Sequence, residues 1–367
     1  MTAPAWVPQT RDRRWSCASP SQEAITFHRT LDSYAPTPLV ELPDLARELG
    51  VGHVFAKDES FRLGLPAFKA LGASWAIHRA LRDRRSDGPL TIVTATDGNH
   101  GRAVARFARL LGHRAAIVVP PGVHPSAVQA IVDEGADVTA IDGSYDDAVA
   151  AAAQLASDIG GVLVQDTAWE GYEEIPGWIV EGYATLFEEA DEQLAAAGLT
   201  HPDLVLVPAG VGSLLQAALA HYRGDRTPEG TAVVSVEPDA AACMGPSLDA
   251  GEPVTVPTGI TVMSGLNCGT PSSLAWPYIR DGLDAALAIT DEAGLRAARD
   301  LAVLGVKAGP CGGAGLAAAR QALTGDGADE RRSHLGIDES SIVLLVITEG
   351  SNANPLPEVG NAPAELS

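Results

Sequence analysis

The sequence predicts an α/β protein with parallel sheets, and the order of its apolar segments carries this prediction. From about residue 88 onward, short runs rich in Val, Ile and Leu alternate with Ala-rich amphipathic stretches. This alternation is typical of strands and helices taking turns around a parallel sheet. Most of the short runs are apolar throughout, as strands covered on both faces should be. No repeat with a period of about 20 to 50 residues occurs, which argues against a solenoid or a propeller.

The expected elements alternate along the chain, and several of the helices begin with small polar or acidic residues that cap exposed amides. Strands are expected at residues 91–95, 115–119, 138–141, 162–165, 204–208, 233–237, 286–289 and 342–348. Helices are expected at residues 67–85, 101–111, 126–134, 145–157, 178–197, 213–222, 291–304 and 312–323. The charged and polar segment 325–341 is expected to be a surface loop before the last strand.

The composition is that of an acidic globular protein. The chain of 367 residues contains 46% hydrophobic and 20% charged residues, so most of it can fold around one large or two medium-sized cores. Its 25 Lys and Arg residues against 47 Asp and Glu residues give a formal net charge of −22. Such a charge repels phosphate backbones and anionic lipids, so we expect a small-molecule partner and neither nucleic acid nor a membrane.

The spacing of the cysteines and the length of the apolar segments predict the cellular compartment of the protein. The cysteines are far apart and contain no C-x-x-C pair, which argues against a structural zinc site and a disulfide framework. They are Cys17, Cys243, Cys268 and Cys311. No apolar stretch approaches the roughly 20 residues that span a bilayer, and none follows the arginines near the N-terminus. We therefore expect a soluble cytoplasmic protein with free thiols and no metal site.

The first segment that could carry chemistry is F-R-L-G-L-P-A-F-K-A-L-G-A-S-W-A at residues 61–76. Lys69 lies near the start of an expected helix and follows Phe68. The positive end of a helix dipole and apolar neighbours both disfavour an ammonium group, so the location favours a nucleophilic amine. Schiff-base chemistry needs such an amine. Taken alone, the segment also fits a solvated lysine in an amphipathic helix.

The second segment is A-T-D-G-N-H-G at residues 95–101, which follows a strand and opens a helix. Asp97, Asn99 and His100 therefore fall at the carboxyl end of a parallel strand, where ligands bind in open α/β sheets. The same letters are also ordinary turn chemistry, because Asp, Gly and Asn tolerate tight backbone geometry.

The third segment is V-L-V-Q-D-T-A-W-E-G-Y at residues 162–172. Asp166 ends a short apolar strand and precedes a loop with Trp169, Glu170 and Tyr172. A carboxylate at this position could act as a general base beneath a planar ligand. The aromatic residues could equally serve only to pin the loop to the body of the protein.

The fourth segment is D-L-V-L-V-P-A-G-V-G-S-L-L at residues 203–215, a strand, a glycine turn and a helix start. Consecutive backbone amides at such a turn form a phosphate cradle. These amides belong to Gly210, Val211, Gly212 and Ser213. The segment also carries two glycines of the dinucleotide fingerprint, and Glu237 ends the next strand where the ribose-binding acid would lie. Leu215 replaces the third glycine, which disfavours a dinucleotide. The alternative interpretation, a tight turn that binds no ligand, stays open.

The fifth segment is K-A-G-P-C-G-G-A-G-L-A-A-A at residues 307–319, a glycine-rich turn that opens an Ala-rich helix. Cys311 in this turn is a weak, neutral hydrogen-bonding group. A lone cysteine is also common as inert packing.

Taken together and in this order, the segments resemble the fold-type II pyridoxal-phosphate enzymes. This group contains threonine and serine dehydratases, cysteine synthase and the tryptophan synthase β chain. Within it, the sequence motifs of this chain are most similar to those of the diaminopropionate ammonia-lyases. The resemblance extends from about residue 34 to residue 350 and includes I-V-E-G-Y-A-T-L, S-G-L-N-C-G and T-E-G. It implies a tryptophan synthase β-like fold with pyridoxal 5'-phosphate (PLP) between two parallel-sheet domains. Residues 1–71 and 176–367 would form the large domain, and residues 72–175 a small inserted one.

The resemblance also assigns roles to individual residues. Lys69 would carry the cofactor, with Phe68 beside it as a further cofactor-binding residue. Asn99 would bond the ring hydroxyl, residues 210–213 would hold the phosphate, and Cys311 would face the pyridine nitrogen. A neutral partner at that nitrogen disfavours a fully delocalised carbanion and suits elimination at the β carbon.

The implied reaction is α,β-elimination of ammonia from 2,3-diaminopropionate, which gives pyruvate and two ammonia molecules. Dehydratases usually have serine where Asp97 stands, so Asp97 and Lys69 would be bases on opposite faces of the Cα. Asp166 would hold the distal amino group of the substrate. The family also implies a homodimer. No regulatory domain of the threonine dehydratase kind is expected, because the chain ends soon after T-E-G.

Other readings of the sequence are a serine or threonine dehydratase and a β-replacing synthase with the same cofactor. From other classes, a nicotinamide-dependent oxidoreductase or a non-catalytic ligand-binding protein would also fit parts of the chain. The pattern departs from the ammonia-lyases at S-G-L-N-C-G-T-P, residues 264–271, and at Cys311, where those enzymes have serine. Pocket residues are therefore expected to differ.

Overall fold

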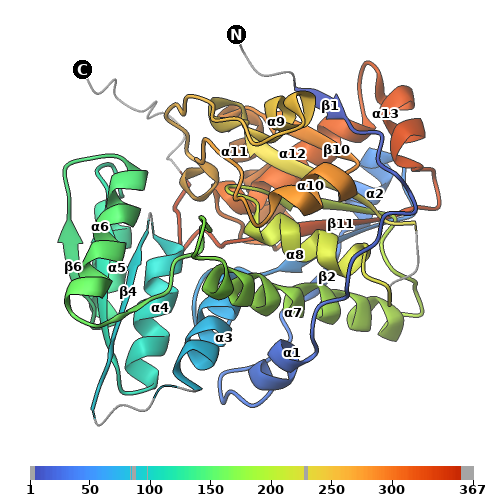
Figure 1. Cartoon of the computed structure of the whole chain (residues 1–367). Helices are drawn as coiled ribbons and strands as arrows, with labels where there is room; N and C mark the ends of the chain where they lie inside the picture. The colour runs from blue at the N-terminus through green and yellow to red at the C-terminus, as the bar shows by residue number, and fades with distance from the viewer. Residues whose placement is uncertain (1–4, 83, 85–87, 97, 227–229, 357–367) are drawn as a thin grey trace.

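The chain folds around two β-sheets, which confirms the predicted α/β class (Figure 1). The computed structural model describes residues 5–82, 84, 88–96, 98–226 and 230–356. The larger sheet consists of β1 (Trp6–Pro8), β2 (Leu39–Glu41), β3 (His53–Asp58), β8 (Leu204–Pro208), β9 (Ala232–Pro238), β10 (Ala285–Ile289) and β11 (Ile342–Ile347). The smaller sheet consists of β4 (Thr91–Ala95), β5 (Arg114–Val119), β6 (Asp137–Ala140) and β7 (Val162–Leu163).

Helices cover both sheets. The first seven are α1 (Glu23–His28), α2 (Pro43–Leu49), α3 (Lys69–Arg82), α4 (Asn99–Leu110), α5 (Pro125–Asp133), α6 (Tyr145–Asp158) and α7 (Glu174–Ala196). The others are α8 (Ser213–Tyr222), α9 (Met244–Ala250), α10 (Trp276–Gly282), α11 (Asp291–Val303), α12 (Pro310–Leu323) and α13 (Ala328–Leu335). Each helix in the described residues is too short or too polar to cross a bilayer.

The larger sheet has the strand order β1-β10-β9-β8-β11-β3-β2, and its inner strands are parallel. The outermost strands β1 and β2 pair antiparallel to their neighbours. Leu204 and Leu206 of β8 pack with α11 and α12, whereas Val205 and Val207 pack with α7 and α8. Because both faces are covered, every position of β8 is buried, which explains why the sequence shows an unbroken apolar run.

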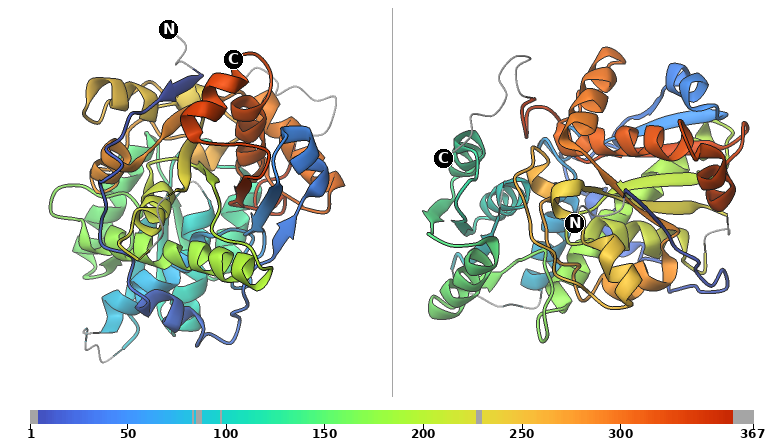
Figure 2. Two further views of the ribbon diagram at one scale, coloured as in Figure 1. Left: turned by 90° about the vertical axis from the view of Figure 1, so that its right-hand side faces the viewer. Right: turned by 90° about the horizontal axis from the view of Figure 1, so that it is seen from above.

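The smaller sheet has the order β6-β5-β4-β7 and is parallel throughout. All of its strands fall within residues 72–175, the stretch expected to form the small domain. In Figure 1, the elements from β4 to α6 lie to the left of the larger sheet, and the view from above in Figure 2 shows the same separation. The domain boundaries themselves stay a prediction.

Helices α3 and α7 pack closely where the two sheets adjoin. A Cβ at Gly182 would lie 2.6 Å from the carbonyl oxygen of Leu71, and a Cβ at Gly72 would lie 2.5 Å from a ring carbon of Tyr183. Glycine is therefore needed at both positions for the helix backbones to approach. This contact fixes the first turn of α3, which begins at Lys69.

The prediction of a surface loop at residues 325–341 is wrong, because this segment contains α13. The helix lies between Gly327 and Gly336, which both have left-handed backbone conformations. Leu335 is its one buried residue. Arg331 and Arg332 donate hydrogen bonds to backbone carbonyls outside the helix. The helix is held by its caps and by arginine contacts and has no apolar stripe. The sequence pattern therefore did not predict it.

A buried cluster of charges joins β3, the turn before α3, and α7. Arg62 donates to Glu59 at 2.6 Å and to Glu189 at 2.7 Å, and Lys57 Nζ lies 2.8 Å from Glu189. All four side chains are fully buried. The two cations and two carboxylates balance, so the cluster is stable only as a complete set.

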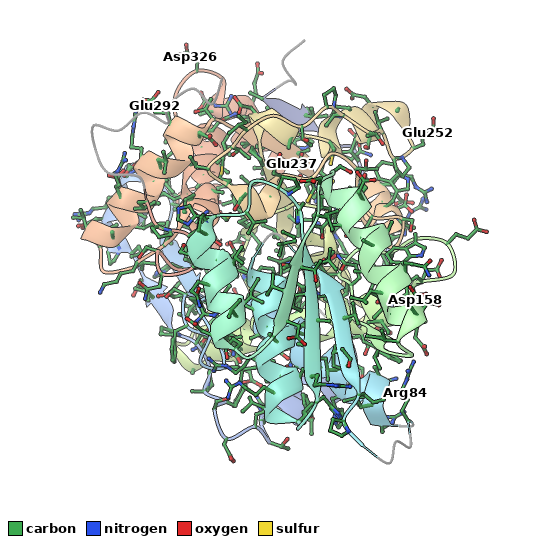
Figure 3. All side chains as sticks on the ribbon, turned by 90° about the vertical axis from the view of Figure 1, so that its left-hand side faces the viewer. Arg84, Asp158, Glu237, Glu252, Glu292 and Asp326 are labelled. Atoms are coloured by element: carbon green, nitrogen blue, oxygen red, sulfur yellow. The ribbon has the colours of Figure 1, made fainter. Side chains whose placement is uncertain are left out.

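We predict that Glu189→Gln lowers the free energy of unfolding by about 3 to 5 kcal/mol, because it leaves a buried cation without its counter-charge. Denaturant unfolding measures this loss. Glu292→Gln is the matched control, because Glu292 projects from the surface (Figure 3) and pairs with Arg296 in solvent. The control should lose no more than roughly 0.5 kcal/mol. Equal small losses in both variants would show that the buried cluster does not stabilise the fold.

Candidate active site

Loops at the carboxyl ends of strands from both sheets meet at one place. Asp166 follows β7, Gly210 follows β8 and Glu349 follows β11, while Lys69 and Asn99 begin α3 and α4. Ligands in open α/β sheets bind at such strand ends. Hydrogen bonds connect these loops, because they join Lys69 to Asp166, Ser213 to Asp166 and Asn99 to Glu349.

Lys69 and Asp166 form the central contact of the site. Lys69 Nζ donates to Asp166 Oδ2 at 2.5 Å, and the amine also lies 5.4 Å from the ring centre of the buried Phe68. Burial raises the pKa of the Asp166 carboxyl, but Lys69 and His100 outweigh it and hold that pKa at about 2. The carboxylate is therefore charged at neutral pH. The sequence did not predict this ion pair.

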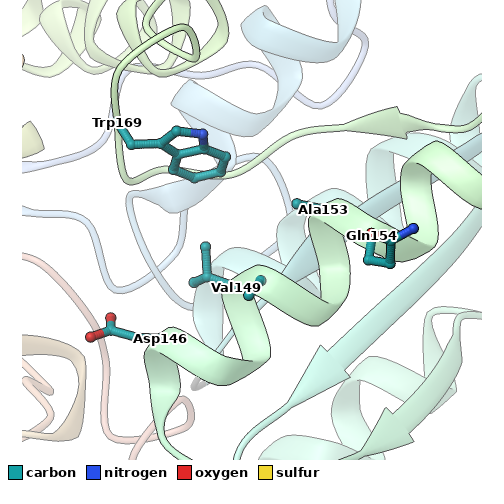
Figure 4. A pocket seen from close by; sticks show the side chains of 6 residues that line it. Asp146, Val149, Ala153, Gln154 and Trp169 are labelled. Carbon is teal, nitrogen blue, oxygen red and sulfur yellow. The ribbon is translucent and has the colours of Figure 1, made fainter.

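The loop after Asp166 is fixed by its aromatic residues. The Tyr172 hydroxyl donates to the carbonyl of Leu163 and accepts from the backbone N–H of Gln165. Trp169 stacks on Tyr172 with ring centres 4.3 Å apart. Trp169 also lines a surface cavity of about 480 Å³ that it shares with Asp146 and other residues of α6 (Figure 4). The aromatic residues thus hold the loop that positions Asp166, as the simpler reading of this segment proposed.

The turn between β8 and α8 has the properties of a phosphate site. Within the described part of the chain, the backbone N–H groups of residues 210–213 have no hydrogen-bond acceptor. Gly212 has a φ of +100°, and a Cβ there would lie 3.0 Å from Ile279. The Ser213 hydroxyl donates to the backbone carbonyl of Asp166 at 3.0 Å. Unsatisfied amides at a helix N-terminus fit a phosphate group, so this turn fits the phosphate of PLP.

Glu349 connects two predicted residues and was given no role by the sequence reading. Its side chain accepts from Asn99 Nδ2 at 2.7 Å and from the backbone N–H of Cys311 at 3.3 Å. Glu349 is buried. Its side chain lies against the N-terminal end of α12, where the helix dipole favours a negative charge. The T-E-G motif was the one signal for this residue. A Cβ at Gly265 would lie 3.5 Å from Cys311 Sγ, so the 264–268 loop also borders the site.

Thr348 and Phe68 join the end of β11 to the start of α3. Thr348 precedes Glu349, and its buried hydroxyl oxygen has no partner in the described part of the chain. The backbone N–H of Phe68 donates to the carbonyl of Thr348 at 3.1 Å, which ties the start of α3 to the end of β11. Asp97 lies outside the described residues, so its proposed role as a base stays a prediction.

Glu237 does not serve as a ribose-binding acid in this structure. Its Oε1 accepts from the backbone N–H groups of Cys243 at 2.8 Å and Met244 at 3.1 Å, and the side chain is buried. Burial raises the pKa of the Glu237 carboxyl to about 7, although both amides lower it. A carboxyl group used in this way is not available to a ligand, which disfavours the dinucleotide alternative.

The lysines of the chain leave one candidate for covalent attachment of a cofactor. The chain contains three lysines: Lys57, Lys69 and Lys307. Lys57 Nζ is enclosed by Glu189, Gln193 and the Thr37 carbonyl. Lys307 is exposed. Lys69 contacts Asp166, whose backbone carbonyl accepts from Ser213 of a turn that fits a phosphate group, so the residues present fit PLP.

Known proteins resemble this chain in sequence and in fold. The family described as "pyridoxal-phosphate dependent enzyme" matches residues 30–347. A diaminopropionate ammonia-lyase of Salmonella typhimurium is 36% identical over 368 aligned residues, covering 92% of this chain and 90% of the relative. The Escherichia coli diaminopropionate ammonia-lyase, solved in complex with an aminoacrylate-PLP azomethine reaction intermediate, has a TM-score of 0.85 at 35% identity and 96% coverage of each chain. Maize serine racemase has a TM-score of 0.75 at 26% identity, covering 91% of this chain and 93% of its own.

The two sheets, the family match and the similarity to solved PLP enzymes define a fold-type II enzyme that uses PLP. The chain belongs to the family of pyridoxal-phosphate-dependent enzymes. The predicted family, fold type and cofactor are thereby confirmed.

We predict that Glu237 makes the fold less stable as the pH rises. Its folded pKa of about 7 lies above its ordinary value of 4.5, so the folded state binds more protons between these pH values. The free energy of unfolding should therefore fall by up to about 3 kcal/mol from pH 4.5 to pH 7. Glu237→Gln keeps an acceptor oxygen but cannot ionise.

The test compares denaturant unfolding of the two proteins at about pH 5 and pH 8. The variant should resemble the wild type at the lower pH and be more stable than it at the higher pH. A difference between the two proteins that is the same at both pH values would contradict the assignment.

Proposed function

We propose that the chain is a lyase that eliminates ammonia from 2,3-diaminopropionate, in its D form, its L form or both, to give pyruvate and two ammonia molecules. The observation that carries this proposal is the contact of Lys69 with a charged, buried Asp166 beside a phosphate-binding turn. The diaminopropionate ammonia-lyases that the chain resembles support it over nearly the whole length.

The cofactor, when bound, supplies an electron sink that acidifies the Cα hydrogen of an amino acid. The backbone amides of residues 210–213 would bind its phosphate, and Asn99, held by Glu349, would bind the ring hydroxyl. Cys311 would face the pyridine nitrogen, and Phe68 would contact the cofactor beside Lys69. Lys69 Nζ would then remove the Cα hydrogen from one face of the substrate, and Asp97 from the other.

Asp166 favours an amine as the leaving group over a hydroxyl. Its carboxylate stays ionised at neutral pH, because its pKa is held at about 2. Once Lys69 is engaged in holding the cofactor, a substrate ammonium group can take the place of the lysine ammonium against Asp166. A charge-assisted hydrogen bond of this kind is roughly twice as strong as one from a neutral hydroxyl. The distal amino group of diaminopropionate meets this requirement, and serine and threonine do not.

We further propose a large domain of residues 1–71 and 176–367, a small domain of residues 72–175, and a homodimer in the cytoplasm. The confinement of β4 to β7 within residues 91–163 supports the division. No disulfide joins the four cysteines in the described residues, which is consistent with a reducing compartment. A mass measurement in solution checks the dimer.

The activity test compares wild type and Asp97→Asn on the two enantiomers of diaminopropionate, with serine and threonine as competing substrates. The wild type should release two ammonia molecules per pyruvate and prefer diaminopropionate. Since one planar substrate exposes its Cα hydrogen to one face, Asp97→Asn should lower kcat for one enantiomer, expected to be the D form, by about 10²- to 10⁴-fold. The visible band of the cofactor should persist in the variant.

Two results would count against the proposal. A wild type that turns over serine or threonine faster than diaminopropionate would identify a dehydratase instead. Equal losses for both enantiomers in Asp97→Asn would mean that Asp97 is structural, and the two-base mechanism would have to be abandoned.

A further inference from the structure

His100 has a buried ring nitrogen that the proposed reaction does not use. His100 is the second residue of α4, and its side chain is buried. Its Nε2 lies 2.8 Å from the carbonyl oxygen of Val164, which can only accept, so Nε2 carries the hydrogen. Nδ1 is then an acceptor, and it has no hydrogen-bond partner in the described part of the chain. Asp166 Oδ2 lies 3.9 Å from Nδ1.

A buried nitrogen without a hydrogen-bond partner is destabilising, so its presence calls for an explanation. His28 shows the usual outcome for a buried histidine of this protein. Its Nδ1 contacts the Thr185 hydroxyl at 2.8 Å, and its Nε2 contacts the Leu71 carbonyl at 3.0 Å. His100 differs because its spare nitrogen faces the carboxylate that also holds Lys69.

The ion pair of Lys69 and Asp166 creates a chemical conflict for cofactor capture. A lysine attacks an aldehyde only as the neutral amine, whereas the carboxylate 2.5 Å away stabilises the ammonium form. While Lys69 is protonated, its charge holds the pKa of Asp166 low, so the ion pair keeps the proton on the lysine. The proton needs a second acceptor within reach of Asp166.

We propose that His100 Nδ1 is that acceptor and that His100 is a positioning residue, acting through Asp166, for the capture of the cofactor by Lys69. The N–H bond of the Lys69 ammonium breaks, an O–H bond forms on Asp166 Oδ2, and the proton passes to Nδ1. Lys69 is left as a neutral amine, and Asp166 is again a carboxylate, now paired with an imidazolium. The cluster starts and ends with one cation and one anion, so the transfer needs no other reactant.

The groups that face His100 agree with this assignment. They are Asp166 and the Val164 carbonyl from the segment around β7, and Lys69 from α3. Burial lowers the pKa of His100, Asp166 raises it, and the Lys69 ammonium lowers it. When Lys69 gives up its proton, its repulsion disappears, and the attraction of Asp166 remains. The neutral amine is a minor state, and covalent capture draws on it continuously.

The test follows the rate at which the protein freed of cofactor develops the visible band after PLP is added, from about pH 6 to pH 10. His100→Gln is the main variant, because its amide can still donate to the Val164 carbonyl but cannot accept the proton. His100→Asn is a second, because it places an uncharged amide near the Nδ1 position. His28→Gln is the control for a change at a buried histidine.

Both His100 variants should capture PLP at least about tenfold more slowly near pH 7. They should recover as the pH rises, because solvent then removes the lysine proton. Their affinity for pyridoxine 5'-phosphate, which has no aldehyde, should equal that of the wild type. His28→Gln should show the wild-type pH profile.

Two results would overturn the inference. One is an unchanged rate profile in both His100 variants. The other is a loss that is equal at all pH values and is matched by weaker binding of pyridoxine 5'-phosphate, which would indicate a structural role. The inference rests on the proposed role of Lys69, but the readout is independent of the substrate. A wild type that captures PLP in a His100-dependent way and leaves diaminopropionate intact would refute the proposed reaction alone.

Discussion

The short contact between Lys69 and Asp166 is the interaction on which the rest of the site depends. It joins residues that are 97 positions apart, one at the start of α3 and one after β7 of the smaller sheet. The Ser213 hydroxyl donates to the Asp166 backbone carbonyl, so the turn of residues 210–213, which we propose as the phosphate site, adjoins the carboxylate that contacts the lysine. An amine, a carboxylate and the proposed phosphate site thereby meet at one junction, which is the arrangement that a PLP enzyme needs.

Each side of this contact is held by groups that lie outside the contact itself. On the lysine side, the fully buried charges around Glu189 anchor the turn before α3, and the close packing of Gly182 against α3 fixes the helix. On the carboxylate side, Tyr172 fixes the loop through two backbone hydrogen bonds. Catalytic groups are effective only when such supports limit their movement, so part of the stability of the fold serves the site.

The sequence predicted the features that depend on local pattern. Lys69 at a helix start and the glycine turn at residues 210–213 are visible in short motifs, and β4, β8 and α8 have the predicted bounds. It did not predict the contact of Asn99 with Glu349, which joins residues 250 positions apart, because such a pairing is decided by the packing of the whole chain. Strands β1 and β2 are three residues long and helix α13 has one buried residue, so none of them forms an apolar pattern that the sequence reveals. Strand β3 was not predicted either.

The central claim is that Lys69 is the residue that holds PLP. Reduction of the coloured protein with borohydride, followed by peptide mass mapping, tests it directly, because the chain offers three lysines as possible sites of attachment. We expect the pyridoxyl group on Lys69, with Lys57 and Lys307 unmodified. A pyridoxyl group on Lys57 or Lys307, with Lys69 unmodified, would contradict it.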